Sequence, residues 1–137
     1  MIPSVLDRFD TPPCASLLGF DLMDADKAKG TVRVRFTARP EFRNASGHVQ
    51  GGLLAAMLDD TLGPAVLIAT DARTLPVTIA LNVTFLAPAK PGTIFGEGWV
   101  RKLGKTIGHV EASLSDEQGV EIARAVASVR LMPMPPG

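Results

Sequence analysis

The feature that most constrains the fold is the segment GGLLAAMLDDTLGPAVLIAT, residues 51–70, which is apolar almost throughout. It is too long for an ordinary strand, and a helix that is apolar on every side is normally buried in a core. Pro64 lies inside the segment and is expected to kink or end the helix, because proline has no backbone N–H to donate. The segment therefore predicts a long central helix.

Strand patterns surround this helix. Residues 30–38 alternate apolar and polar side chains, which is the period-2 signature of a half-buried strand. After the helix, four further segments have strand character and are separated by turn-forming residues: residues 75–87, 93–103, 105–116 and 120–132. One strand, one buried helix and four consecutive strands predict an α+β fold, an antiparallel sheet of five to six strands wrapped around a long central helix.

The chain has 137 residues, which suits a single domain over residues 1–137. Its proline-rich ends, residues 1–13 and 133–137, are expected to be loosely ordered.

Charge and composition exclude several classes of function. Fourteen Lys and Arg offset fourteen Asp and Glu, and nucleic-acid binders normally carry a basic excess, so nucleic acid is not an expected partner. Cys14 is the single cysteine, and the two histidines are not clustered, so neither a disulfide within the chain nor a metal site is predicted. No signal peptide and no run of about 18 apolar residues is visible, so we expect a cytoplasmic protein without a membrane span.

Asp59 and Asp60 stand in the middle of the apolar helix. A buried carboxylate is costly unless it is paired or functional. At about 100° per residue, Asp59 shares its helix face with small residues, which leave room for a substrate, whereas Asp60 falls among larger apolar ones. Asp59 is therefore the stronger catalytic candidate. The alternative is that both aspartates bind local backbone groups or face a neighbouring subunit.

Gly51 and Gly52 open the helix. Glycines allow a ligand to approach the N–H groups of the first turn, where the helix dipole is positive and an oxyanion can be held. Alone, two glycines would indicate no more than a tight entry into the helix. Together with a carboxylate two turns later, they predict acyl transfer or hydrolysis without a cofactor.

The run NASGHVQGGLLAAMLDD, residues 44–60, resembles the active-site segment of hotdog-fold acyl-CoA thioesterases of the phenylacetate-degradation (PaaI-like) group. Asn44, Gly47, Gly51, Gly52 and Asp59 match the pattern of that group. The later stretches TIALNVTFLAPAKPGT and KLGKTIGHVEASL resemble the strands and turns that follow in the same group, so the resemblance extends over residues 40–130. One position departs from the pattern, because Gln50 stands where the group has histidine.

The resemblance implies a role for each matching residue. Gly51, with Asn44 and Gln50 nearby, would bind and polarise the thioester carbonyl. Asp59 would be the general base for water or the nucleophile that forms an acyl-enzyme anhydride. Thr78 occupies a position where relatives place a hydroxyl that orients the water. Gln50 can donate a hydrogen bond but cannot act as an acid near neutral pH.

The resemblance also implies a substrate and an assembly. The substrate would be an aryl- or short- to medium-chain acyl-CoA, with coenzyme A as part of the substrate rather than a cofactor. Basic side chains in two turns would meet its phosphates: Lys90, Lys102 and Lys105, with Arg101 beside them. His48 and Gly52 would lie at the rim of the substrate site. The same lysines could equally be solvated surface charges. The site would be shared across a homodimer, and dimers would pair into a homotetramer.

Two other functions were considered for the same pattern. The first is a hotdog protein that binds acyl-CoA without turnover, as a sensor or carrier partner, and the loss of the histidine at Gln50 favours it. The second is a hydratase, which would require a different acid–base pair near the helix. Asn44, Gly51, Asp59 and Thr78 together favour the thioesterase.

Overall fold

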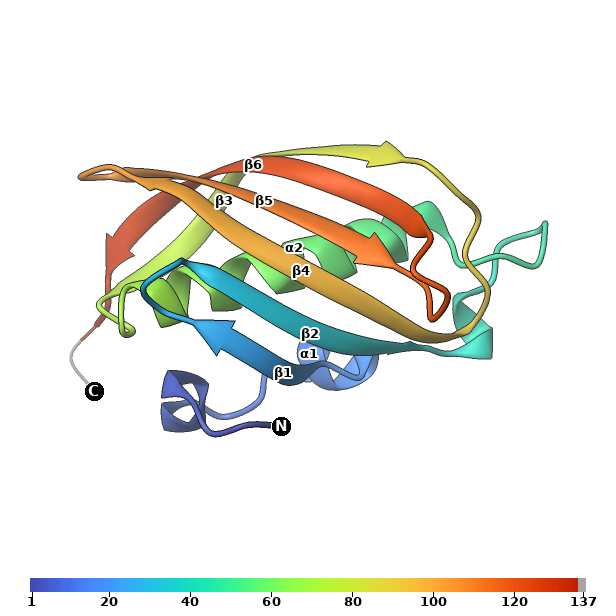
Figure 1. The fold of residues 1–137 in the computed structure, drawn as a ribbon, viewed down its shortest axis with the longest axis horizontal. Helices are drawn as coiled ribbons and strands as arrows, with labels where there is room; N and C mark the ends of the chain where they lie inside the picture. Colours follow the sequence, from blue (N-terminus) through green and yellow to red (C-terminus); the bar gives the residue numbers. More distant parts are fainter. Residues whose placement is uncertain (136–137) are drawn as a thin grey trace.

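The computed structural model describes residues 1–135, and its longest element is the helix α2 (Gly51–Ala69). The helix lies along one face of a six-stranded antiparallel sheet that curves around it (Figure 1). The strands pair in the order β1-β2-β4-β5-β6-β3, so β1 and β3 are the edges. Their bounds are β1 (Asp21–Asp26), β2 (Thr31–Ala38), β3 (Thr74–Phe85), β4 (Gly92–Leu103), β5 (Ile107–Ser115) and β6 (Glu121–Pro133). The predicted α+β hotdog architecture is confirmed.

Helix α2 packs closely on the middle of the sheet. Met57 and Leu58 are wholly buried on the helix side, and Phe36 of β2 is wholly buried on the sheet side. Gly96 of β4 permits the close approach, because a Cβ atom there would lie 2.8 Å from the Thr61 hydroxyl oxygen. The Thr61 hydroxyl is buried but has a hydrogen-bond partner, because it donates to the carbonyl of Met57 at 2.8 Å. The apolar segment thus forms the core that its sequence predicts.

The helix does not end at Pro64, although the sequence made that an open alternative. Ala65 and Val66, which directly follow the proline, are buried in the core. Their packing favours a continuous helix and offsets the hydrogen bond that proline cannot make.

Four elements were not predicted: η1 (Val5–Arg8), α1 (Pro13–Leu18), β1 and η2 (Pro40–Phe42). We expected residues 1–13 to be loosely ordered, yet the structure folds them against the domain. Ser4 and Asp7 form a reciprocal capping box around η1, and the Ile2 N–H donates to the Leu22 carbonyl at 3.1 Å.

The other end of the chain is also tied down as far as the structure describes it. The Met134 N–H donates to the Arg73 carbonyl at 3.1 Å. The expectation of loose order at 133–137 extends to residues 136 and 137, which lie outside the described residues.

One face of the molecule is apolar and exposed. Val77, Ile79 and Phe85 of the edge strand β3 are 48%, 58% and 53% exposed. Gly52 and Ala56 of α2 are exposed as well, so the helix is not buried on every side in the single chain. A long edge strand with apolar side chains is a surface on which another chain can pair.

Among the described residues, one helix meets the length and hydropathy criteria for a membrane span. It is Gly51–Ala69, with a mean hydropathy of 1.5. The same residues pack against the sheet, and the core helix of a folded domain meets these criteria for that reason.

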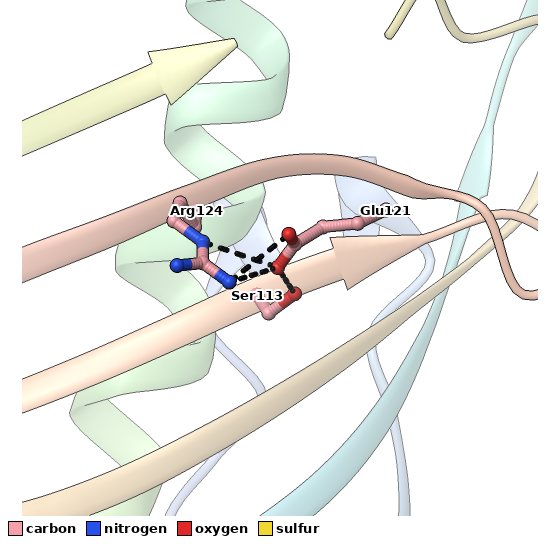
Figure 2. A network of polar contacts seen from close by, with 3 residues as sticks. All are labelled: Ser113, Glu121 and Arg124. Carbon is pink, nitrogen blue, oxygen red and sulfur yellow. Dashed lines mark hydrogen bonds and ion pairs between the residues drawn. The ribbon is translucent and has the colours of Figure 1, made fainter. Parts of the chain in front are cut away.

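A polar network lies on strands β5 and β6 (Figure 2). The Ser113 hydroxyl donates to Glu121 at 2.6 Å, and Arg124 donates to both carboxylate oxygens of Glu121. The Ser113 hydrogen bond and the Arg124 charge hold the pKa of Glu121 below its ordinary value. Glu121 is therefore an ionised structural residue rather than a candidate acid.

Candidate active site

Asp59 and Thr78 meet across the gap between helix α2 and strand β3. The Thr78 hydroxyl donates to Oδ1 of Asp59 at 2.7 Å, although the two residues are 19 positions apart in the sequence. Both residues are exposed in the single chain. The carboxylate thus has one oxygen held in place and the other available to a reacting group. The sequence singled out both residues, and the structure brings them together.

The second cluster lies in the loop before α2 and in its first turn. Oδ1 of Asn44 accepts from the Ser46 N–H at 3.0 Å and from the Ser46 hydroxyl at 2.7 Å. Nδ1 of His48 lies 3.1 Å from that same hydroxyl. Since the carbonyl side of the Asn44 amide is used within the loop, its NH₂ group remains as the donor that can meet a ligand.

Gln50 is the N-cap of α2, and Gly51 and Gly52 form its first turn. The N–H groups of this turn have no partner within the helix. Gly51 also lies against a ring, because a Cβ atom there would be 3.2 Å from Phe85. No atom would lie within 4 Å of a Cβ at Gly52, which is therefore open to a ligand or a second chain.

The two clusters are separated in one chain. Gly51 and Asp59 are eight residues apart on α2, which corresponds to about 12 Å along the helix axis. A base must lie within about 3 Å, or one water molecule, of the proton that it removes. The donors of one chain and the carboxylate of the same chain therefore cannot act on one thioester carbonyl.

The predicted basic residues do not form one cluster in the single chain. Lys90 lies in the loop before β4, next to the second cluster, because Ala89 accepts a 2.8 Å hydrogen bond from the Val49 N–H. Lys102 and Lys105 lie at the opposite end of β4, at the turn into β5 (Figure 1). Arg101, near them, is engaged with Glu111 at 2.6 Å.

Asp60 differs from its neighbour. It lines a cavity between α2, the N-terminal segment and the start of β3, and its Oδ2 atom is buried without a hydrogen-bond partner among the described residues. Burial, and then the nearby charge of Asp59, raise the pKa of Asp60 to about 7. Sequence reasoning missed this cavity, because its outer wall is the N-terminal segment that we expected to be loosely ordered.

No group of three or more His, Cys, Asp or Glu side chains that could hold a metal ion occurs in residues 1–135. The candidate site consists of carboxylate, hydroxyl, amide and backbone groups.

This arrangement can be compared with known proteins. The sequence profile of the Thioesterase superfamily matches residues 46–123, which include Asp59, Thr78 and the first turn of α2. The chain belongs to the Thioesterase superfamily. The enzyme class predicted from the sequence, a hydrolase of thioester bonds, is confirmed, as is the resemblance to the phenylacetate-degradation group.

Three relatives illustrate the similarity. Acyl-coenzyme A thioesterase 13 of Homo sapiens is 31% identical over 91 residues, which are 66% of this chain and 64% of the relative. A phenylacetic acid degradation-related protein of Ralstonia eutropha JMP134 superposes with a TM-score of 0.86 at 30% identity, covering 92% of this chain and 95% of that one. A Streptococcus mutans protein whose structure is bound to acetyl CoA has a TM-score of 0.73 at 22% identity, with coverages of 84% and 90%.

Proposed function

We propose that this thioesterase hydrolyses an aryl- or short- to medium-chain acyl-CoA, without a cofactor. The observation that carries the proposal is the 2.7 Å hydrogen bond from Thr78 to Asp59 on the exposed face of α2. The human relative is named for acyl-CoA hydrolysis, and a protein with this fold holds acetyl CoA. Both facts support a CoA ester as the substrate.

Asp59 is the proposed reacting carboxylate. Thr78 holds Oδ1, so Oδ2 can take a proton from water while the water oxygen attacks the carbonyl carbon. The tetrahedral oxyanion then collapses, the C–S bond breaks, and the CoA thiolate leaves and is protonated. Alternatively, Oδ2 attacks the carbonyl first and water hydrolyses the resulting anhydride. Thr78 favours both routes, because its oxygen can still accept a hydrogen bond from the incoming water.

The oxyanion is proposed to bind at the first turn of a second copy of the chain. The Gly51 N–H lies about 12 Å along α2 from the Asp59 of its own chain, and the Asn44 and Gln50 amides belong to the same end of the helix, so we propose that another copy brings these donors to Asp59. The exposed apolar edge β3 and the small residues Gly52 and Ala56 are a suitable surface for that copy. We therefore propose a homodimer with two shared sites, which pairs into a homotetramer.

Lys90, Lys102 and Lys105 are proposed to meet the phosphates of coenzyme A, with His48 and Gly52 at the rim of the site. All three lysines are exposed, as phosphate contacts require. Since Lys90 lies at the other end of β4 from Lys102 and Lys105, one phosphate group can meet both ends only through two copies of the chain.

The test is thiol release from acetyl-, hexanoyl-, lauroyl-, phenylacetyl- and 4-hydroxybenzoyl-CoA. Wild-type protein is expected to turn over at least one of them, and Asp59→Asn is expected to lose about 10²- to 10⁴-fold in kcat, the usual effect of removing a general base. Asp60→Asn, which leaves the Asp59 carboxylate in place, is expected to remain active. Thermal unfolding of each variant controls for misfolding.

Absence of turnover on every thioester, together with measurable binding of the CoA esters, would contradict the proposal. That outcome would favour the non-catalytic acyl-CoA binding protein, because Gln50 lacks the titratable ring that the related enzymes place there.

A further inference from the structure

The cavity beside Asp60 lies next to the reacting carboxylate but has no part in the chemistry proposed above. Its volume is about 340 Å³. A cavity of about 150 Å³ is enough to hold benzene, so this one has room for an acyl group of moderate size. Its walls are mainly apolar and come from distant parts of the chain: Leu6, Phe9, Phe20, Leu67, Leu75 and Met134.

Two residues that line the cavity lie close in the chain to Asp59 and Thr78. Gly63, one of its lining residues, follows Asp59 by one helical turn, about 6 Å along α2. Pro76, another lining residue, precedes Thr78 by two positions on β3, so the two share a face of the strand about 7 Å apart. A thioester whose carbonyl lies at Asp59 and Thr78 therefore has this cavity within reach of its acyl chain.

Asp60 is the polar exception in the part of the wall that α2 provides. Its Oδ2 atom is buried and has no hydrogen-bond partner within the described chain. Its backbone carbonyl also loses the usual helical hydrogen bond, because residue 64 is a proline. An unsatisfied buried carboxyl is costly for folding, so its presence in an apolar cavity calls for a ligand that supplies a donor.

We infer that Asp60 determines substrate specificity, by favouring acyl groups that carry a hydroxyl at their distal end over wholly apolar acyl groups of the same length. The inference rests on the proposed function and deepens it. The hydroxyl donates to the carboxyl group of Asp60, which lines the cavity, while the rest of the acyl chain packs against the apolar walls. A wholly apolar acyl group instead leaves the carboxyl buried and unsatisfied.

The surroundings of Asp60 give this selection a pH dependence. Asp59 lies beside it on α2, Asp10 lines the cavity from the N-terminal segment, and the Met1 amino group, near the cavity, is paired with Asp21 at 3.2 Å. No Lys, Arg or His side chain lines the cavity within the described residues. An ionised Asp60 can still accept from a hydroxyl, whereas an apolar chain would strip it of water. The preference should therefore increase as the pH passes through 7, where Asp60 ionises.

The experiment compares kcat/KM for two matched pairs, hexanoyl- with 6-hydroxyhexanoyl-CoA and octanoyl- with 8-hydroxyoctanoyl-CoA, between pH 6 and 8.5. Wild-type protein is expected to favour the hydroxylated member of at least one pair by about tenfold at pH 8. Asp60→Leu should reduce that ratio to about one. Asp60→Asn, which keeps a hydrogen-bonding side chain of the same shape, should retain part of the preference and lose its pH dependence.

Asp10→Asn is the matched control, because it removes the other carboxylate of the cavity wall and should leave the ratio unchanged. A wild-type ratio near one for both pairs, an unchanged ratio in Asp60→Leu, or a ratio that responds to Asp10 instead would each overturn the inference. Thermal unfolding shows whether each variant is folded. If wild-type protein hydrolyses none of these four esters, the panel of five thioesters above still decides the proposed function. Calorimetry then gives the dissociation constants of the hydroxylated and apolar esters for wild type and Asp60→Leu. Their ratio in each protein decides the inference separately from the proposed function.

Discussion

Asp59 and Asp60 are consecutive residues on one helix, yet they face different surroundings. Asp59 is exposed, accepts a hydrogen bond from Thr78 and lies among small residues. Asp60, rotated by about 100°, faces an apolar cavity with Oδ2 buried, and its pKa is raised to about 7. The phase of the helix therefore gives two identical side chains different surroundings, which in the account proposed above assign Asp59 to chemistry and Asp60 to recognition.

The largest expected effect concerns stability, because the buried carboxyl of Asp60 lowers the free energy of unfolding once it ionises, whereas the exposed Asp59 does not. A carboxyl whose pKa is raised on folding holds a proton that the unfolded chain releases, so stability falls as the pH rises from about 4 to about 7. With allowance for its partial exposure, the loss is on the order of 2 kcal/mol by pH 8. Asp60→Asn should therefore be more stable than wild type at pH 8, by a margin that shrinks toward pH 4.

Urea unfolding of wild type and Asp60→Asn at pH 4.5, 6 and 8 measures this margin. Glu121→Gln is the opposite control, because the pKa of Glu121 is lowered by Ser113 and Arg124 in the folded state. That variant should be less stable than wild type at neutral pH, and its deficit should shrink as the pH falls below the ordinary glutamate pKa. A margin for Asp60→Asn that is independent of pH would show that Asp60 is not buried as described.

A smaller effect is expected at Thr78. Thr78→Val keeps the shape of the side chain but removes the hydroxyl that holds Oδ1 of Asp59. The expected result is a loss of about tenfold in kcat with little change in KM, which corresponds to ~1.4 kcal/mol for a hydrogen bond to a charged group. Thr78→Ser, which restores the hydroxyl, should recover most of the activity. Equal activity of the valine and serine variants would remove Thr78 from the site.

The smallest expected effect is on the pKa of Asp60 when the charge of Asp59 is removed. The charge of Asp59 is the second cause of the raised pKa of Asp60, after burial. Asp59→Asn should therefore lower the pKa of Asp60 from about 7, while leaving it above its ordinary value. Carbon-detected NMR titration of the aspartate carboxyls measures this pKa in wild type and variant. An unchanged value would show that the two carboxyls do not interact.

The helix and strands could be predicted from the sequence where the local pattern of apolar residues agrees with their burial. The helix expected over residues 51–70 is observed as Gly51–Ala69, and each of the five expected strands is present within a few residues of its predicted bounds. β1 was missed because Asp21, Asp24 and Asp26 conceal its alternation. The prolines of the first 13 residues led us to expect loose order there, and the helical elements of this segment were not predicted. Pro12 and Pro13 instead stand at the start of helix α1, where proline costs least.

The candidate site was predictable in its members but not in its geometry. The pairing of Asp59 with Thr78 depends on how β3 returns beside α2, which no local pattern encodes. The environment of Asp60 depends on a cavity wall contributed by the N-terminal segment, which is about 40 or more residues away in the sequence. Strand β4 separates Lys90 from Lys105, as expected for residues that the sequence assigned to two different turns.

The most direct test of the account is a heterodimer that carries Asp59→Asn in one chain and Asn44→Ala in the other, isolated through two different affinity tags. Each substitution alone should inactivate both shared sites of its homodimer. In the heterodimer, one site combines the intact Asp59 of one chain with the intact Asn44 of the other, so about half of the wild-type activity is expected. A heterodimer as inactive as either homodimer would contradict the account, because it would place Asp59 and Asn44 in the same site of the same chain.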